Sequence, residues 1–350
     1  MKRVLRFVIC LAAVSTPVSQ SVAAPLMYVP TGSGNEIVVI DVAQDRVVRR
    51  IGELENAHGL AAAPGGEYLV AGSMLAAKPE QTSVVEKPAQ VSDAEHKQHH
   101  AADPAKTATP STLSIVHIKR GQVVRRIPVE GLTHHTAVSP DGRVAIAVHS
   151  ASDRISIVNL ETMTVAKTLK TGAAPNYAVF SRDGTRLYVS NSGANTVSEI
   201  DTARWTILRE LPGGKKPEHL SVSHDGKTLY VAAVDGAEVS ALDLAAGTPA
   251  KTYATGKGPH GLALSVDGRW LFAAGLEDGS LVRWDLSTGA AQRIELKPAP
   301  YHVEYVDAVK KLYVSSRIEP KIWILDPGSL TVRGVIELDK GAVGHQMVVM

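Results

Sequence analysis

The stretch PHGLALSVDGRWLFAAGLEDGSLVRWDLSTGAAQRIEL, residues 259–296, decides the fold. It holds four short segments suited to β-strands, at residues 261–264, 269–274, 280–284 and 291–296. An Asp-Gly pair at 267–268 marks the turn between the first two segments. Four strands in a unit of about 42 residues predict one blade of a β-propeller.

The same pattern recurs along the chain at a fixed interval. Asp-Gly pairs begin at Asp141, Asp183, Asp225 and Asp267, each 42 residues after the one before. A second marker closes a β-rich run in each unit, where it can form an Asx turn, and keeps nearly the same step: Asn159, Asp201, Asp243, Asp285 and Asp326. An open two-sheet sandwich does not explain this spacing, so the sequence favours a ring of blades.

Six complete units and two partial ones account for residues 26–350. The complete units begin near His58, His134, Asn176, Glu218, His260 and Tyr301. Residues 26–51 supply three outer strands without an inner one, and residues 345–350 supply an inner strand alone. Pairing them completes a seventh blade and leaves no free sheet edge. We therefore predict an all-β fold, a single seven-bladed β-propeller over 26–350, and we expect a monomer.

The N-terminal segment is predicted to be a secretory signal peptide. Residues 1–23 begin with a basic stretch, continue with an apolar run and end in the small residues that a signal peptidase accepts. The expected location is therefore periplasmic or secreted. The one cysteine, Cys10, lies in this segment, so the mature chain would have no disulfide, thiolate metal site or cysteine nucleophile.

Residues 75–112 are predicted to form a flexible insertion within one unit. They are rich in Ala, Pro, Lys, Glu, Ser and Thr, and they carry His96, His99 and His100, a composition that hints at weak metal capture. A solvated loop is the simpler interpretation of this segment.

Net charge and hydropathy narrow the range of partners. The formal net charge is +2, and without Lys2, Arg3 and Arg6 of the signal segment it is −1. This balance argues against nucleic acid as a partner. No later segment is long and apolar enough to span a membrane. The expected partners are a small molecule or a protein that donates or accepts metal.

Three units share a phrase that resembles the YVTN-type propeller repeat: residues 186–191, 228–232 and 311–315, which read RLYVSN, TLYVA and KLYVS. The resemblance covers nearly the whole chain after the signal segment. It implies an exported seven-bladed propeller related to cytochrome d1 haem-domain-like propellers and similar in fold to lactonases. The repeat specifies a fold and leaves the activity open, since this fold serves many unrelated functions.

The histidines gather at the start of the predicted inner strands. Aligning the seven strands gives a first column of His58, His134, Asn176, Glu218, His260, Tyr301 and His345. The next column is Gly59, His135, Tyr177, His219, Gly261, His302 and Gln346. Seven of the 13 histidines lie in these columns, whereas random placement predicts about 0.5. Inner strands surround the propeller axis, so we expect these residues to converge at one mouth of the central channel.

Sites rich in imidazole and without thiols favour copper or zinc over Mg²⁺ and Ca²⁺, which prefer oxygen ligands. We expect copper, with zinc or a haem-type cofactor as alternatives. The predicted metal ligands are His58, His134, His135, His219, His260, His302 and His345. Because adjacent strand residues point to opposite sides, interblade hydrogen bonding is the competing interpretation.

The other column members suggest supporting roles. Glu218 is the candidate catalytic base or carboxylate ligand, and Tyr177 and Tyr301 are candidates for donating hydrogen bonds to a bound oxygen species. The chain contains no G-x-S-x-G motif of a serine hydrolase. The adjacent pair His134 and His135 resembles the copper-cluster propeller of nitrous oxide reductase, although the cupredoxin domain of that enzyme is absent.

Three functions follow from this arrangement. The first is a metal-binding propeller for small-molecule redox chemistry or metal handling. The second is a non-enzymatic binding module for a partner protein or a haem-type cofactor. A lactonase-like hydrolase is disfavoured, because such sites need carboxylates and Glu218 is the one acid in either column.

Overall fold

The computed structural model describes residues 25–77 and 109–350. The predicted signal peptide at 1–23 lies outside the described residues, as does most of the predicted insertion at 75–112 with its three histidines. The described part of the chain contains no helix with the length and apolar character that a membrane span requires.

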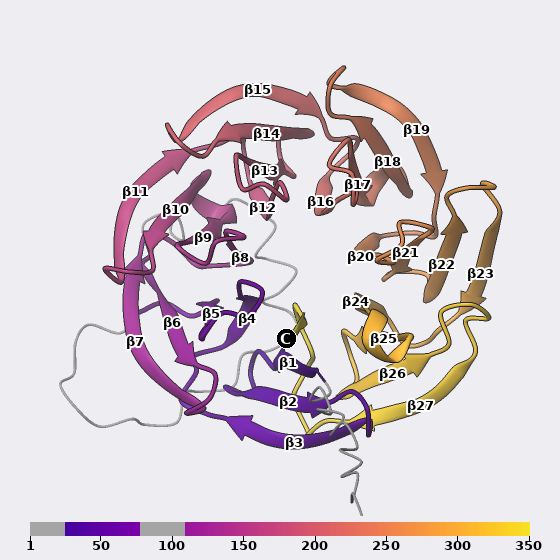
Figure 1. The fold of residues 1–350 in the computed structure, drawn as a ribbon, viewed down its shortest axis with the longest axis horizontal. Coiled ribbons are helices and arrows are strands. Elements are labelled where there is room, and N and C mark those ends of the chain that lie inside the picture. The colour runs from indigo at the N-terminus through magenta and orange to yellow at the C-terminus, as the bar shows by residue number, and fades with distance from the viewer. Residues whose placement is uncertain (1–24, 78–108) are drawn as a thin grey trace, which may run out of the picture.

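Seven four-stranded antiparallel sheets surround a common axis in the described residues (Figure 1). Blade 1 comprises β4 (Ala57–Ala61), β5 (Tyr68–Ser73), β6 (Ser111–His117) and β7 (Gln122–Val129). Blade 2 comprises β8 (Thr136–Val138), β9 (Val144–His149), β10 (Arg154–Asn159) and β11 (Thr164–Lys170). Blade 3 comprises β12 (Pro175–Phe180), β13 (Arg186–Asn191), β14 (Thr196–Asp201) and β15 (Thr206–Pro212).

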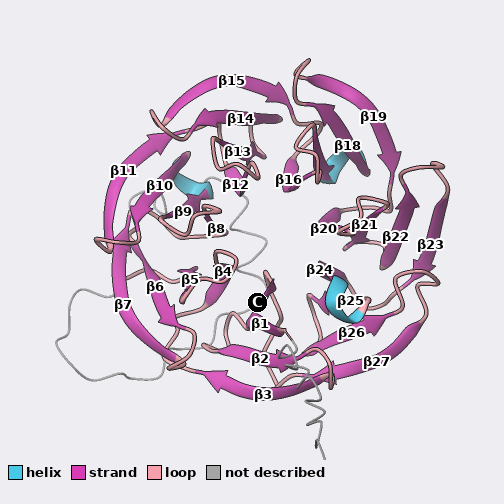
Figure 2. Cartoon of the chain, viewed as in Figure 1, coloured by secondary structure: helices cyan, strands magenta, loops and turns pink. Residues whose placement is uncertain are grey.

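The second half of the ring repeats this arrangement. Blade 4 comprises β16 (Pro217–Val222), β17 (Thr228–Ala233), β18 (Glu238–Asp243) and β19 (Thr248–Ala254). Blade 5 comprises β20 (Pro259–Leu264), β21 (Trp270–Gly275), β22 (Ser280–Asp285) and β23 (Ala291–Glu295). Blade 6 comprises β24 (Pro300–Val306), β25 (Lys311–Ser316), β26 (Lys321–Leu325) and β27 (Val332–Glu337). Three short 3₁₀ turns, shown as helix in Figure 2, follow strands: η1 (Ser150–Ser152), η2 (Val234–Gly236) and η3 (Asp307–Val309).

Blade 7 joins the two ends of the described chain, as predicted. Its strand order is β28-β1-β2-β3, with β28 (Val348–Val349) innermost, followed by β1 (Leu26–Pro30), β2 (Ile37–Asp41) and β3 (Arg46–Ile51). In the register, Met27 lies opposite Val349 and Tyr28 opposite Val348. The predicted seven-bladed all-β propeller and its mode of closure are confirmed.

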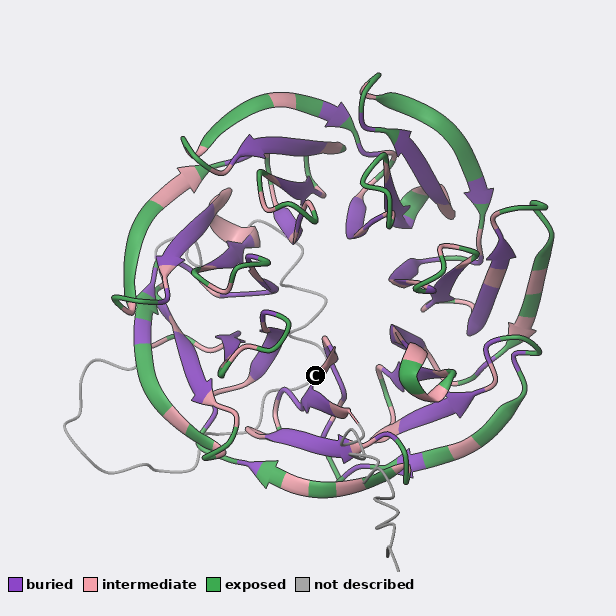
Figure 3. Ribbon diagram, viewed as in Figure 1, coloured by how far each residue is buried: buried purple, intermediate pink, exposed green. Residues whose placement is uncertain are grey.

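The core lies between the blades, and each of its seven clusters joins two adjacent sheets. Middle strands are buried on both faces because a neighbouring blade covers each of them, as Val38 and Val39 of β2 show. The outermost strands are largely exposed, as β11 and β19 show, and form the mostly green rim in Figure 3. Burial on two faces explains why Val, Ile, Leu and Ala can build this core with few aromatic residues.

The repeated Asp-Gly pairs are the turns between the first and second strands of their blades. Gly268 has a φ of +70°, a left-handed conformation that glycine adopts without steric cost. The Asp267 carboxylate accepts hydrogen bonds from the Ser265 hydroxyl at 2.5 Å and the Arg269 amide at 3.0 Å. The glycines of the other three pairs have φ between +69° and +73°. The Asp-Gly pairs therefore recur in the sequence because each of these turns needs a residue in the left-handed conformation.

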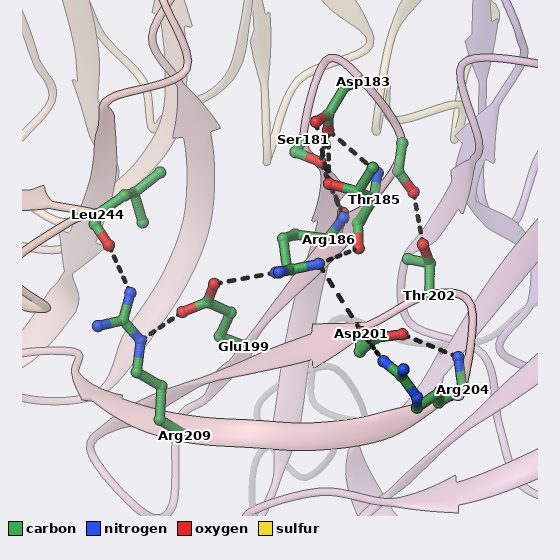
Figure 4. A network of polar contacts seen from close by, with 11 residues as sticks. Ser181, Asp183, Thr185, Arg186, Glu199, Asp201, Thr202, Arg204, Arg209 and Leu244 are labelled. Atoms are coloured by element: carbon green, nitrogen blue, oxygen red, sulfur yellow. Dashed lines mark hydrogen bonds and ion pairs between the residues drawn. The ribbon is translucent and has the colours of Figure 1, made fainter.

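A polar network ties the outer part of blade 3 to blade 4 (Figure 4). Arg209 donates from Nε to Glu199 at 2.5 Å and also bonds to the Leu244 carbonyl of the next blade. Arg186 lies 3.5 Å from the same Glu199 carboxylate. Because the arginines are more than one-third exposed, we assign these ion pairs a positioning role with little net stabilisation.

Candidate metal centre

Five of the seven inner strands in the described residues begin with a backbone irregularity at the two predicted columns. In blade 4, the ladder between β16 and β17 shifts register between Pro217 and Leu220, so Glu218 and His219 lie in a bulge. The inner strands of blades 1, 3, 5 and 6 have the same shift at the equivalent place. In blade 2, His134 and His135 precede β8. A bulge redirects side chains, which allows residues of both columns to turn inward.

Three histidines of the second column meet across the axis. His135, His219 and His302 come from blades 2, 4 and 6, and their ring centroids lie 5.0, 4.8 and 5.8 Å apart. All three are buried. Tyr177 of blade 3 stacks on His219 at 4.4 Å, and its hydroxyl accepts a hydrogen bond from Gln346 Nε2 at 3.4 Å. The side chains therefore fill the axis at the start of the inner strands.

Four histidines of the first column lie in two groups beside these three. The His58 ring lies 4.0 Å from that of His345 and 4.5 Å from that of His134. On the other side, the His260 ring lies 4.4 Å from that of His219 and 4.2 Å from that of Tyr301.

Two polar contacts extend these groups. Glu218 Oε2 lies 3.3 Å from His260 Nε2. The Tyr301 hydroxyl reaches across to His58 Nε2 at 3.3 Å.

Two glycines of the second column make room for neighbouring histidines. A Cβ atom on Gly59 would lie 2.7 Å from the His135 backbone, and one on Gly261 would lie 2.3 Å from the Tyr301 carbonyl oxygen and 2.8 Å from His302 Cα. Such distances are closer than van der Waals contact allows. The glycines of blades 1 and 5 thus permit the close approach of the backbone segments that carry His135 and His302.

Backbone carbonyls fix the orientation of two imidazoles. His135 Nδ1 lies 2.9 Å from the Asn176 carbonyl oxygen, and His58 Nδ1 lies 2.9 Å from the His134 carbonyl oxygen. A carbonyl only accepts, so each Nδ1 carries the proton and each Nε2 carries the lone pair. This kind of support is typical of the outer hydrogen bonds that orient metal-binding histidines.

Among the residues that the structure describes, two sets of three histidines have ligand atoms close enough to hold a metal ion. One is His58, His134 and His135, and the other is His135, His219 and His302; within each set the ligand atoms lie within 4.8 Å of one another. The buried Nε2 atoms of His219 and His302 have no hydrogen-bond partner in the part of the chain that the structure describes. A buried nitrogen without a partner is costly, and a bound ion would satisfy both atoms.

Burial sets the protonation state of the cluster. It lowers the pKa of His219, His260, His302 and His345 well below 6.5, with smaller contributions from neighbouring histidines or Arg317. These imidazoles are therefore neutral near pH 7, which is the form that binds metal. Burial also raises the pKa of Glu218 to about 7, against the opposing charge of Lys216.

Glu304 is not among the site residues predicted from the sequence. This residue of β24 lies two positions after His302, and burial raises its pKa to about 8. Burial raises the pKa of Tyr177, and the charge of Glu304 adds to this rise. Strand alternation could have identified Glu304, because residues two apart point to the same side. Arg317, whose guanidinium lies 5.5 Å from the centre of the Tyr301 ring, was also not predicted, and no sequence pattern identifies it.

The structure brings the seven predicted histidines into one buried cluster. Five of them belong to the two sets with metal-binding spacing, whereas His260 and His345 lie beside those sets. Glu218 and Tyr301 contact histidines of the cluster directly, and Tyr177 stacks on one. The competing interpretation holds in part, since His58 and His135 each bond to a carbonyl of the next blade.

The fold and the cluster define a class of protein, a seven-bladed β-propeller with a histidine-lined axis. A family model described as YNCE-like β-propeller matches residues 85–247 and 172–319, together more than half of the chain. The chain therefore belongs to the YNCE-like β-propeller family. No match was found among curated proteins.

Several solved structures share this fold. The periplasmic gluconolactonase of Pseudomonas aeruginosa has a TM-score of 0.70 at 17% identity, covering 93% of this chain and 99% of that one. A functionally unknown protein from Desulfotomaculum acetoxidans has a TM-score of 0.71 at 14% identity, covering 93% and 98%. Hydrazine synthase of Kuenenia stuttgartiensis has a TM-score of 0.63 at 17% identity, covering 93% and 99%. At these identities the likeness concerns the fold alone.

Proposed function

We propose that this propeller binds a transition-metal ion, with copper favoured over zinc, among the histidines at the start of its inner strands. The ion would serve metal handling or small-molecule redox chemistry in the periplasm or outside the cell. The observation that carries the proposal is the convergence of His135, His219 and His302 from three separate blades, with two of their Nε2 atoms buried and lacking a hydrogen-bond partner among the described residues.

The chemistry of the ligand set supports copper or zinc. Imidazole nitrogen suits both ions, whereas Mg²⁺ and Ca²⁺ require oxygen ligands that these sets do not contain. When bound, copper supplies one-electron redox chemistry, and either ion supplies Lewis acidity at a position that three ligands leave open. The deep burial of the histidines disfavours a partner protein as the direct occupant and favours an ion or a small ligand.

The surrounding residues can position a small molecule and move protons. Glu218 and Glu304 have pKa values raised to about 7 and about 8 by burial, so each can hold or release a proton near neutral pH. Tyr177 and Tyr301 stay protonated, because burial raises the pKa of both hydroxyls, and each can donate a hydrogen bond.

Metal-assisted hydrolysis of a small ester or lactone is a second candidate. The observation that favours it is the pair of carboxyl groups with near-neutral pKa values, a property of general acids and bases. The fold is also shared with a periplasmic gluconolactonase. Hydrolysis of gluconolactone by the zinc-loaded protein tests this candidate, and a Glu304→Gln variant is expected to be slower. A rate no higher than that of the metal-free protein would reject the candidate.

Metal content tests the primary proposal. The full chain is prepared with His96, His99 and His100 changed to Ala, so that bound metal reports the cluster alone. Reconstitution with Cu²⁺ or Zn²⁺ is expected to leave a stoichiometric ion, which the double change His134→Ala/His135→Ala removes. His224→Ala, a change at an exposed turn, is the matched control and should retain the ion. Absence of metal from the folded protein, checked by circular dichroism, would reject a metal site.

A further inference from the structure

The two histidine sets have one member in common, His135. We infer that the cluster holds one metal ion at a time, in either of two positions that exchange through His135, and that the Tyr301 hydroxyl biases the ion toward one of them. The axial position is formed by His135, His219 and His302, and the lateral position by His58, His134 and His135. This inference rests on the proposed metal binding and specifies where and how many ions bind.

The hydrogen bond of His135 prevents double occupancy. Its Nδ1 donates to the Asn176 carbonyl at 2.9 Å, so the ring has a single lone pair, at Nε2. That lone pair lies in the plane of the ring and can point to one ion. Bridging two ions would require removal of the Nδ1 proton and loss of the bond to the carbonyl. Two divalent ions in so small a buried cluster would also repel each other strongly.

The two positions differ in what an ion must displace. At the lateral position, His58 Nδ1 donates to the His134 carbonyl, so Nε2 is the nitrogen that can bind an ion. The Tyr301 hydroxyl occupies that lone pair at 3.3 Å. An ion at the lateral position must therefore break this hydrogen bond.

The axial position requires no equivalent loss at two of its three ligands. The Nε2 atoms of His219 and His302 have no hydrogen-bond partner among the residues that the structure describes. Loss of the hydrogen bond between Tyr301 and His58 corresponds to an affinity about 2- to 10-fold lower at the lateral position. The Tyr301 hydroxyl therefore biases the ion toward the axial position, with the lateral position within reach of the same ion.

The arrangement provides a route by which the ion changes position inside the protein. Movement from the axial to the lateral position exchanges His219 and His302 for His58 and His134 while His135 stays bound. Tyr301, from blade 6, thus controls access to ligands contributed by blades 1 and 2. It acts as a positioning residue on His58.

Zn²⁺ titration of the full chain tests the number of positions, again with the three histidines of the insertion changed to Ala. The unaltered cluster is expected to bind one equivalent. His58→Ala removes the lateral position and His302→Ala removes the axial one, and each variant should still bind one equivalent, more weakly in His302→Ala. The combined variant should bind none. Circular dichroism and thermal unfolding establish that each variant is folded.

Tyr301→Phe tests the bias between positions. In the His302→Ala background it should raise Zn²⁺ affinity about 2- to 10-fold, because the competing hydrogen bond is gone. In the His58→Ala background it should leave Zn²⁺ affinity unchanged. If the hydroxyl had only a structural role, its removal would change affinity in both backgrounds.

Three results would overturn the inference: two equivalents bound by the unaltered cluster, loss of all binding in folded His302→Ala, or an equal effect of Tyr301→Phe in both backgrounds. The count in the unaltered cluster needs no variant in the site and is decisive even if a variant misfolds. Absence of any ion from the unaltered cluster would instead reject the proposed metal site itself.

Discussion

Acidification from pH 7 to pH 5 should destabilise the metal-free protein steeply, because the buried histidines must stay neutral in the fold. Five of them have lowered pKa values: His149, His219, His260, His302 and His345. For His149, burial lowers the pKa to about 4. In the unfolded chain each titrates near pH 6.5. Below that pH the unfolded chain binds protons that the folded chain does not, so folding stability falls as pH falls.

Two carboxyl groups with raised pKa values act in the opposite direction. Burial raises the pKa of Glu218 to about 7 and that of Glu304 to about 8, whereas glutamate in an unfolded chain titrates near 4.3. Between these values the folded chain holds the protons, so each group adds stability as pH falls from its folded pKa toward about 4.3. Their contribution offsets part of the loss from the histidines.

The net effect follows from the difference in protons. Between pH 6 and pH 5 the unfolded chain binds about five more protons at the histidines and about two fewer at the glutamates than the folded chain. The net difference of about three protons lowers the unfolding free energy by about 4 kcal/mol per pH unit. Single domains have unfolding free energies of about 5–15 kcal/mol, so the metal-free protein should approach unfolding near pH 5.

Urea unfolding followed by far-UV circular dichroism, with a chelator present, measures this slope at half-unit steps of pH. His260→Gln should reduce the slope by about 1.4 kcal/mol per pH unit, and His224→Gln, at an exposed turn, should leave it unchanged. An unfolding free energy that is constant or rises from pH 7 to pH 5 would refute the neutral, buried cluster.

Other predictions concern the ring itself. Gly261→Ala places a Cβ atom 2.3 Å from the Tyr301 carbonyl oxygen and should cost about 3 kcal/mol in urea unfolding, whereas Gly52→Ala, with no atom within 4 Å, should cost almost nothing. Tyr313→Phe removes hydrogen bonds of 3.1 Å to the Val42 carbonyl and 2.7 Å to Asp45, and should cost about 2 kcal/mol by the same assay. Deletion of residues 345–350 removes β28 and exposes the edge of β1; a lower melting temperature and increased light scattering on heating are expected, and an unchanged melting temperature would argue against closure by this strand.

The fold could be predicted because the Asp-Gly turns recur every 42 residues and so reveal the blade repeat. Each Asp-Gly pair occupies a position where glycine alone adopts the left-handed backbone without strain, so the repeat is visible without any knowledge of packing. The N-terminal segment supplies three strands and the C-terminal segment supplies one, so together they make one four-stranded blade. The strand order β28-β1-β2-β3 follows from this pairing.

The site could be predicted as a cluster but not as a coordination set. Alignment identified which residues begin the inner strands, while ordinary strand alternation gave no means of deciding which column faces the axis. The bulges after Ala57, Pro175, Pro217, Pro259 and Pro300 allow residues of both columns to turn inward, and they depend on pairing between strands. The shared role of His135 likewise depends on a carbonyl of the next blade, which no local sequence pattern reports.

Closure of blade 7 has a consequence for the order of folding. Pairing Tyr28 with Val348 joins segments separated by nearly the whole described chain, whereas the other contacts within each sheet link nearby strands. Contacts of long sequence separation form late, because the loop entropy must be lost before they contribute. The hairpins of the first six blades can therefore form early, while His345 reaches His58 when the ring closes. The histidine cluster is therefore complete only after β28 has paired with β1.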